Sequence, residues 1–204
     1  MKDCVKLNNL SEIRDFYDVF LIDLWGVIHN GIAAFENVIP VLNTLKQNNK
    51  MVFFITNAPR RSFIISQQLE GFGIKQDFYE KIVSSGELTW LSIKEKYQKK
   101  NCLMIGPPRD YHLVEGLDVT IVDKDSDVDI ILNTGPWGDD DCLENYTDLL
   151  DSLARKHSHM ICSNPDKIVV RGENFMICAG LLAEYYEKIG GKVEYYGKPY
   201  KQIY

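Results

Sequence analysis

The stretch Asp18-Val19-Phe20-Leu21-Ile22-Asp23-Leu24-Trp25-Gly26-Val27 decides the fold. Residues 19–22 form a continuous apolar run, as expected of a strand that a parallel sheet buries on both faces. Asp23 stands where that strand ends, and open α/β sheets bind ligands at the carboxyl ends of their strands. Gly26 lets the backbone turn sharply and approach a ligand closely. Taken alone, such a run more often marks a capped strand or turn, so other segments must decide.

A second apolar run, residues 51–55, follows a segment with apolar residues at helical spacing between Val38 and Leu45. We therefore expect a strand, an amphipathic helix and a second strand. The crossover in such a unit is right-handed and lays the two strands parallel. The second run ends in Thr56 and Asn57, which are therefore predicted at the same sheet edge as Asp23.

A second alternation of apolar runs and helices begins after residue 100. We expect four short strands with a sheet of their own, at 102–105, 119–122, 128–132 and 159–162. The apolar pattern from Phe175 to Lys188 predicts a helix. A last strand is expected at 193–196, directly before Gly197 and Lys198. The sequence thus predicts an α/β fold with a second α/β unit inserted into the first.

Composition limits the function class. The 204 residues carry a formal net charge of −6, with Lys and Arg interspersed among the acids, so no basic face for nucleic acid stands out. The five cysteines lack paired spacing, which is typical of reduced thiols in the cytoplasm rather than of disulfides or zinc sites. Residues 1–14 are polar, and no apolar run is long enough to cross a bilayer, so we expect a cytoplasmic protein without a signal peptide or membrane span.

Polar groups stand at three expected strand ends: Asp23, the Thr56-Asn57 pair and Lys198. A carboxylate can attack phosphorus, a hydroxyl and an amide can hydrogen-bond a phosphoryl group, and an ammonium can offset its negative charge. Together these groups point to phosphoryl transfer to a carboxylate.

This ordered set resembles the haloacid-dehalogenase-like (HAD) hydrolase superfamily, and within it class IIA, the NagD-like and 4-nitrophenylphosphatase-like enzymes. The best matches are Ile-Thr-Asn at 55–57, Ser-Asn-Pro-Asp at 163–166 and Tyr-Gly-Lys-Pro at 196–199. The resemblance covers nearly the whole chain. It implies a Rossmann-like parallel sheet core at 1–100 and 172–204, with an inserted α/β cap domain of the C2 type at 101–171. The cap would close over the site and select the substrate.

The resemblance also implies roles for individual residues. Asp23 would attack phosphorus, form an aspartyl-phosphate and bind Mg²⁺ together with the backbone carbonyl of Trp25. Lys198 would neutralise the nucleophile and the phosphate. The substrate is expected to be a small phosphorylated metabolite. The residues that would contact the substrate or its phosphate are Gly26, Thr56, Asn57, Arg60, Asn164 and Asp166.

Trp25 departs from the family pattern. In the phosphatases this position usually holds a second aspartate, which protonates the leaving oxygen and later activates water. Indole cannot exchange a proton near neutral pH, and general acid-base help is typically worth about 10² to 10⁴ in rate. We therefore expect a slow phosphatase, or one that acts on a good leaving group. Two alternatives stay open: a non-catalytic member that binds a ligand or partner, and a dehalogenase, because 2-haloacid dehalogenases also place an aromatic residue here.

The end of the chain is a second departure. The family's acidic metal-binding motif lies on the strand after the lysine, and this sequence stops at Tyr204. We expect a fragment or a natural truncation with fewer carboxylate ligands for Mg²⁺ and therefore little or no activity. An unpaired edge of the core sheet would also favour a homodimer.

Two further groups are candidates for a functional role. His29 follows the nucleophile loop and could supply the missing acid-base function, although a loop histidine bonded to backbone is the plainer interpretation. Four acids between Asp123 and Asp129 lack the glycine and the terminal glutamate of a calcium loop, and we interpret them as a solvated acidic turn.

Overall fold

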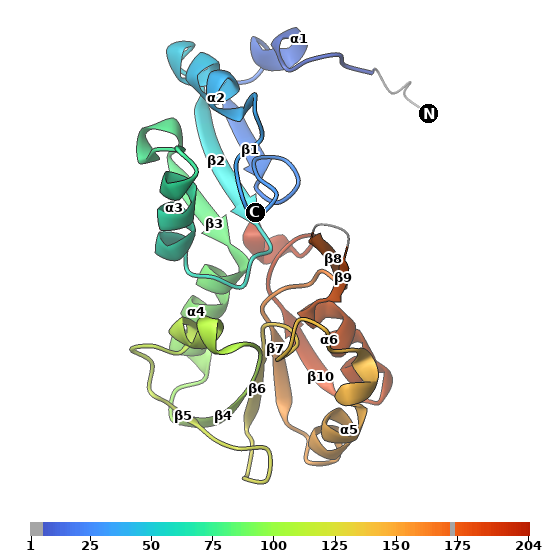
Figure 1. Ribbon diagram of the computed structural model, residues 1–204. Helices are drawn as coiled ribbons and strands as arrows, with labels where there is room; N and C mark the ends of the chain where they lie inside the picture. Colours follow the sequence, from blue (N-terminus) through green and yellow to red (C-terminus); the bar gives the residue numbers. More distant parts are fainter. Residues whose placement is uncertain (1–5, 172–173) are drawn as a thin grey trace. The chain divides into compact units, whose positions relative to one another are not determined.

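The computed structural model describes residues 6–171 and 174–204. The chain divides into two compact units (Figure 1). Unit 1 comprises Met1–Ile55 and Ser66–Ile82, and unit 2 comprises Thr56–Ile65 and Val83–Tyr204.

Unit 1 contains the predicted strand, helix, strand segment. The strands β1 (Val19–Asp23), β2 (Met51–Thr56) and β3 (Lys81–Ser84) form a sheet in the order β1-β2-β3. β1 and β2 are parallel, with Asp23 opposite Ile55, as the right-handed crossover requires. The crossover helix α2 (Val38–Gln47) buries one apolar face. The remaining helices between residues 6 and 82 are α1 (Ser11–Arg14), α3 (Ser62–Gly71) and the 3₁₀ helix η1 (Gln76–Phe78).

β1 differs from its prediction in burial. Val19 and Leu21 are 44% and 58% exposed, whereas Phe20 and Ile22 are partly buried. Alternate residues of a strand point to opposite faces of the sheet. β1 is therefore covered on one face, and the prediction that it is buried on both faces is wrong.

Unit 2 contains a five-stranded parallel sheet in the order β10-β7-β6-β4-β5. Its strands are β4 (Lys100–Ile105), β5 (Val119–Ile121), β6 (Ile130–Asn133), β7 (His159–Cys162) and β10 (Lys192–Tyr195). The first four are the strands predicted for a sheet of their own. We expected β10 in the core sheet, but it pairs with β7, with Lys192 opposite His159. The bounds 101–171 for a cap domain stay a prediction.

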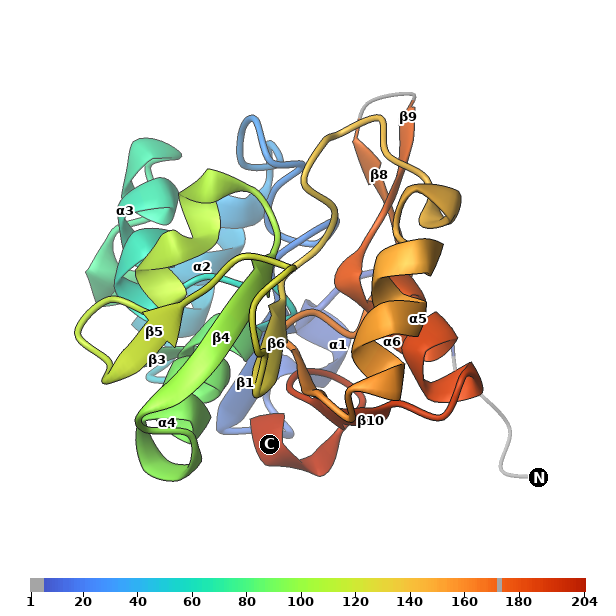
Figure 2. The ribbon, with the colours of Figure 1, turned by 90° about the horizontal axis from the view of Figure 1, so that it is seen from below.

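Helices cover both faces of this sheet (Figure 2). On one face, α5 (Thr147–Arg155) and α6 (Ala179–Lys188) contribute Leu150, Leu153 and Leu182 to a fully buried apolar cluster. On the other face, α4 (Ser85–Lys96) and the 3₁₀ helix η2 (Pro108–Leu113) contribute Ile93 and Leu113 to a second cluster. Apolar residues on both faces of β4, β6 and β7 explain why these three strands read as apolar runs. Short 3₁₀ helices occur at η3 (Leu143–Asn145) and η4 (Lys201–Ile203).

The helix predicted from Phe175 begins later. α6 starts at Ala179, and β9 (Asn174–Ile177) pairs antiparallel with β8 (Ile168–Arg171). The side chain of Phe175 is 79% exposed, so it does not belong to the buried face of the helix. The apolar pattern is shared by a strand and a helix, which a helical period alone does not separate.

None of the helices in the described part of the chain has both the length and the apolar character needed to cross a bilayer.

Candidate active site

The loop after β1 is a tight turn within unit 1. Gly26 has φ +77° and its N–H donates to the His29 carbonyl at 2.9 Å. The Leu24 carbonyl accepts from the N–H groups of Ile28 and His29. This left-handed conformation favours glycine, as the sequence predicts for Gly26. The Asp23 carboxylate accepts a hydrogen bond from Leu24 N–H at 2.8 Å, so the backbone of the turn orients the predicted nucleophile. We call residues 23–29 the Asp23 loop.

Trp25 and His29 pack against each other in this loop. Their rings are edge to face with centroids 5.7 Å apart. Gly31 lies directly under the indole, because a Cβ atom there would come within 2.5 Å of Trp25 Cη2. His29 is buried, and its Nδ1 accepts a hydrogen bond from Gly31 N–H at 3.0 Å. The structure therefore fits the interpretation of His29 as a loop histidine bonded to backbone, because the lone pair of Nδ1 accepts the Gly31 N–H.

Three sequence-predicted residues meet in unit 2 through one side-chain amide. Asn57 Nδ2 donates to Asp166 Oδ1 at 2.9 Å and to the Lys198 carbonyl at 3.1 Å. Asn57 Oδ1 accepts from Lys198 N–H at 2.6 Å. Gly197 lies against the amide, because a Cβ atom there would be 2.7 Å from Asn57 Oδ1. We call Asn57, Asp166 and Lys198 the Asn57 cluster.

Thr56 and Asn164 flank this cluster. Thr56 is the buried last residue of β2, and its Oγ1 accepts from Ala58 N–H at 3.2 Å. Asn164 Oδ1 accepts from Asp166 N–H at 3.1 Å, which fixes the loop after β7. The structure therefore places four of the predicted substrate-contact residues beside Lys198 in unit 2. Asp23, Trp25 and Gly26 belong to unit 1.

A row of hydroxyl groups on α4 supports both loops of the cluster. Ser85, Thr89 and Ser92 lie on one buried face of the helix. Ser85 Oγ lies within hydrogen-bond distance of the carbonyl oxygens of Ser163, at 2.5 Å, and of Tyr196, so its single proton is shared between these two acceptors. Thr89 Oγ1 donates to Ser163 Oγ at 2.9 Å, and Ser92 Oγ is hydrogen-bonded to the Tyr196 hydroxyl. We call Ser85, Thr89 and Ser92 the α4 hydroxyl row.

Sequence reasoning missed the α4 hydroxyl row. Its partners Ser163 and Tyr196 directly precede Asn164 and Gly197, so α4 anchors the chain where it enters the two loops. The sequence does indicate this row, because its three hydroxyl residues are at positions i, i+4 and i+7, which share one face of a helix.

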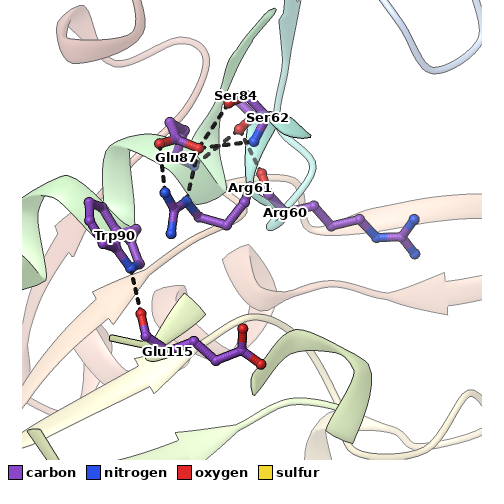
Figure 3. Close-up of polar contacts among 7 residues, drawn as sticks. All are labelled: Arg60, Arg61, Ser62, Ser84, Glu87, Trp90 and Glu115. Carbon is purple, nitrogen blue, oxygen red and sulfur yellow. Dashed lines mark hydrogen bonds and ion pairs between the residues drawn. The ribbon is translucent and has the colours of Figure 1, made fainter. Parts of the chain in front are cut away.

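Arg60 and Arg61 have different surroundings. Arg61 Nε and Nη2 donate to the two oxygens of Glu87 at 2.9 and 3.1 Å (Figure 3). Burial alone would raise the pKa of Glu87, but hydrogen bonds from Arg61 and Ser62 outweigh burial and lower it. Arg61 also lies 3.8 Å from the centre of the Trp90 ring. The Arg60 side chain points away from this group (Figure 3), and its contact with substrate stays a prediction.

The donor chemistry of the Asp23 loop fits Mg²⁺ with few protein ligands. Asp23 offers a carboxylate and Trp25 a backbone carbonyl, both oxygen donors. Mg²⁺ in proteins is usually held by one or two carboxylates together with water and substrate phosphate. Within residues 6–171 and 174–204, no group of three or more His, Cys, Asp and Glu side chains could hold a metal ion. That finding includes the acidic turn around Asp129, whose carboxylate accepts from Asn101 N–H.

Comparison with known proteins decides the family. A family model described as haloacid dehalogenase-like hydrolase matches residues 20–120, which include the Asp23 loop and Thr56. A solved structure of a haloacid dehalogenase-like family hydrolase from Brucella suis is 32% identical, with a TM-score of 0.90. The alignment covers 98% of this chain and 73% of that chain. This chain belongs to the haloacid dehalogenase-like hydrolases.

Other solved HAD-like structures share the fold. A possible sugar phosphatase from Cytophaga hutchinsonii is 16% identical, with a TM-score of 0.79 over 98% of this chain and 74% of that chain. A 4-nitrophenylphosphatase from Thermotoga maritima is 21% identical, with a TM-score of 0.68 over 91% and 69% of the two chains. These comparisons confirm the predicted class IIA fold, a parallel-sheet α/β architecture. No match was found among the curated proteins compared with this chain.

Proposed function

We propose that this HAD-like hydrolase removes phosphate from a small phosphorylated metabolite through an aspartyl-phosphate on Asp23. The observation that supports the proposal most is the Asn57 cluster, which joins residues 109 and 141 positions apart in the sequence. These hydrogen bonds hold the Lys198 backbone against Asn57, the residue that follows Thr56. Of two solved structures with the same fold, one is named as a 4-nitrophenylphosphatase and the other as a possible sugar phosphatase, which favours phosphate esters as substrates.

In this proposal Asp23 is the nucleophile. A carboxylate oxygen forms a bond to phosphorus while the bond from phosphorus to the leaving oxygen breaks, and water later releases phosphate from the aspartyl-phosphate. The Leu24 N–H group, which donates to the carboxylate, orients it for attack. In an enzyme of this type, most of the remaining rate enhancement comes from charges and hydrogen-bond donors that are already in position around the transition state.

Thr56 and Lys198 would stabilise the transferred phosphoryl group. Because Thr56 Oγ1 already accepts from Ala58 N–H, its own hydroxyl proton is directed to another acceptor, and a phosphoryl oxygen is the proposed one. The Lys198 ammonium would offset the negative charge on phosphate and nucleophile. Gly26, Arg60, Asn164 and Asp166 are proposed substrate contacts.

Mg²⁺ is the proposed cofactor. Asp23 and the Trp25 carbonyl would hold it, and when bound it would neutralise part of the phosphate charge. Cytoplasmic location and homodimer formation also stay predictions from the sequence, open to cell fractionation and sedimentation measurements.

Trp25 is the observation that favours a second candidate, a protein that binds a phosphate ester without turnover. Its indole cannot exchange a proton near neutral pH, and Gly31 and His29 hold it firmly in the loop. Dehalogenation is a less favoured alternative that also rests on Trp25, because 2-haloacid dehalogenases place an aromatic residue at this position too.

A phosphate-release assay tests the proposal. It uses the full protein that the gene encodes, a panel of small phosphomonoesters and added Mg²⁺. We expect turnover of at least one ester and its loss in Asp23→Asn. Asp18→Asn is the matched control, because Asp18 is exposed just before β1 and contacts only Lys50 among the ion pairs described. Binding of esters by the wild type without any phosphate release would favour the second candidate. Equal rates in wild type and Asp23→Asn would contradict the proposed nucleophile.

A further inference from the structure

A cavity of about 400 Å³ lies beside the edge strand β5, and all the residues that line it belong to unit 2. Its volume is within the range of small-molecule sites in proteins. The walls are apolar and aromatic, and the turn after β5 adds Asp123, Lys124 and Asp125 to the lining. We call it the β5 cavity.

The β5 cavity forms because β5 is shorter than its neighbour β4. β4 pairs with β5 over residues 100–102 only, whereas its pairing with β6 continues to Ile105. In the described sheet β5 is the last strand and ends at Ile121, so Met104 has no strand partner on that side. The Met104 carbonyl instead accepts a hydrogen bond from the Trp137 indole N–H at 3.3 Å. A side chain thus replaces a strand here, and Met104 and Trp137 both line the space beside it.

Trp137 is held in place although it is 44% exposed. Its backbone N–H donates to the Tyr146 hydroxyl at 2.6 Å, and the centroids of the two rings are 5.1 Å apart. The bond to Met104 fixes the other end of the side chain. An aromatic side chain that is already fixed loses little conformational entropy when a ligand packs against it. Trp137 is therefore a preformed wall for a ligand.

Tyr111 is a second aromatic wall of the β5 cavity. It comes from η2 and is 42% exposed. Within residues 6–171 and 174–204, no contact between a cation and a ring involves Tyr111, Trp137 or Lys124. The face of an aromatic ring attracts a cation that lies within about 6 Å of its centre. The cations of the described chain leave these two rings to a ligand.

The charged part of the lining favours a cation. Asp123 and Asp125 outnumber Lys124, and none of the three takes part in an ion pair within the described part of the chain. The turn that carries them is closed by a hydrogen bond from Ser126 N–H to the Asp123 carbonyl at 3.0 Å. No group of three His, Cys, Asp or Glu side chains among the described residues could hold a metal ion. Charge complementarity therefore favours an organic cation.

We propose that the β5 cavity binds a small alkylated ammonium ion. Its apolar alkyl groups would lie against Trp137 and Tyr111, and its charge would be offset by Asp123 and Asp125. A methylated ammonium combines the apolar surface that the walls require with the positive charge that the carboxylates require. The site uses residues of unit 2 alone. Its occupancy is measured without a phosphate ester, so it stands apart from the proposed phosphatase function.

Choline and its tert-butyl analogue separate charge from shape. In the analogue a carbon atom replaces the charged nitrogen, and the shape is nearly the same. The measurement is titration calorimetry with the full chain, as wild type, as Trp137→Leu and as the double variant Asp123→Asn/Asp125→Asn. Asp127→Asn is the matched control, because Asp127 is an exposed acid of the same turn that is outside the lining of the cavity.

We expect choline to bind the wild type saturably at millimolar concentration or below, and the analogue to bind about tenfold more weakly. Trp137→Leu should weaken the binding of both compounds. The double variant, which changes only exposed side chains, should weaken choline about tenfold and leave the analogue unchanged. Asp127→Asn should match the wild type.

Three results would overturn the proposal. The first is the absence of choline binding to the folded wild type at millimolar concentration. The second is equal affinity for choline and its analogue, or an unchanged choline affinity in the double variant. The third is tighter binding of adenosine than of choline, which would make the cavity a site for a neutral ring.

Discussion

The Asp23 loop of unit 1 and the Asn57 cluster of unit 2 are held in opposite ways. The loop is closed by backbone bonds among residues 24–29, so its shape follows from a few neighbouring residues and one glycine. The cluster is closed by a single side-chain amide between segments 109 and 141 residues apart. The proposed nucleophile thus depends on local sequence, whereas the proposed phosphate site depends on tertiary packing. Substitutions should therefore separate chemistry from binding and stability.

Among substitutions in unit 2 that test the Asn57 cluster, the largest effect on activity is expected from Lys198→Met. The substitution removes the ammonium charge but leaves the backbone groups that bond Asn57. We expect phosphate release to slow by about 10²- to 10³-fold, because a positioned charge in a site is worth that much. Lys201→Met is the control, since Lys201 lies in the next turn of chain and is exposed. An unaltered rate would remove Lys198 from the proposed mechanism.

Asn57→Ala should lower both the stability of unit 2 and its affinity for phosphate. It removes three hydrogen bonds and leaves the partner groups of Asp166 and Lys198 without the amide. These hydrogen bonds are only partly buried, and one such bond contributes about 0.5–1.5 kcal/mol, so we expect a loss of stability of about 1–2 kcal/mol in urea unfolding and about tenfold weaker inhibition by inorganic phosphate. Asn48→Ala, whose amide bonds only the Thr44 carbonyl, should stay within about 0.5 kcal/mol of wild type. Equal losses in both variants would show that the cluster has no special role.

Thr89→Val tests whether the α4 hydroxyl row reaches the phosphate site. Valine keeps the shape but removes the bond to Ser163 Oγ, so we expect about 1 kcal/mol lower stability. Phosphate inhibition should weaken about two- to fivefold, because Ser163 precedes the loop of Asp166. Thr44→Val deletes an exposed helical hydroxyl that bonds Pro40 O, and it should change neither quantity. Lower stability with unaltered phosphate inhibition would limit the row to a structural role.

The smallest effect concerns pH. The pKa of Glu87 is lowered, so its contribution to stability is present above its usual value of 4.5 and is lost as pH falls through the lowered value. Glu87→Gln should therefore be less stable than wild type at pH 7 by about 1 kcal/mol. At a pH below both values the two proteins should be nearly equal. Urea unfolding at both pH values is the measurement, and a difference that grows toward low pH would contradict this account.

The local features of the sequence predicted much of this fold. Ser84 and Glu87 stand three positions apart, the spacing of a helix cap, and Ser84 Oγ accepts from Glu87 N–H at 3.0 Å. Strand 159–162 was predicted with its observed bounds. Such features depend on residues a few positions apart, which periodicity and capping rules describe well.

Pairing between distant segments was harder to predict. The run at 193–196 indicated a strand, but nothing local determines that it pairs with β7. Asn57 was assigned to substrate, whereas its amide is used for Asp166 and the Lys198 backbone. Arg61 binds Glu87, twenty-six residues further along the chain, and nothing in the sequence near Arg61 indicates this partner. In each case the missing information is a partner more than twenty residues away, which sequence spacing does not encode.

Mass spectrometry of the acid-quenched enzyme, sampled during turnover of a phosphomonoester, tests the central claim most directly. We predict one phosphoryl group on the peptide that contains Asp23, lost on treatment with hydroxylamine and absent from Asp23→Asn. Turnover by a wild type that carries no phosphoryl group on this peptide at any sampled time, or carries it on another side chain, would contradict the claim that the Asp23 carboxylate attacks phosphorus.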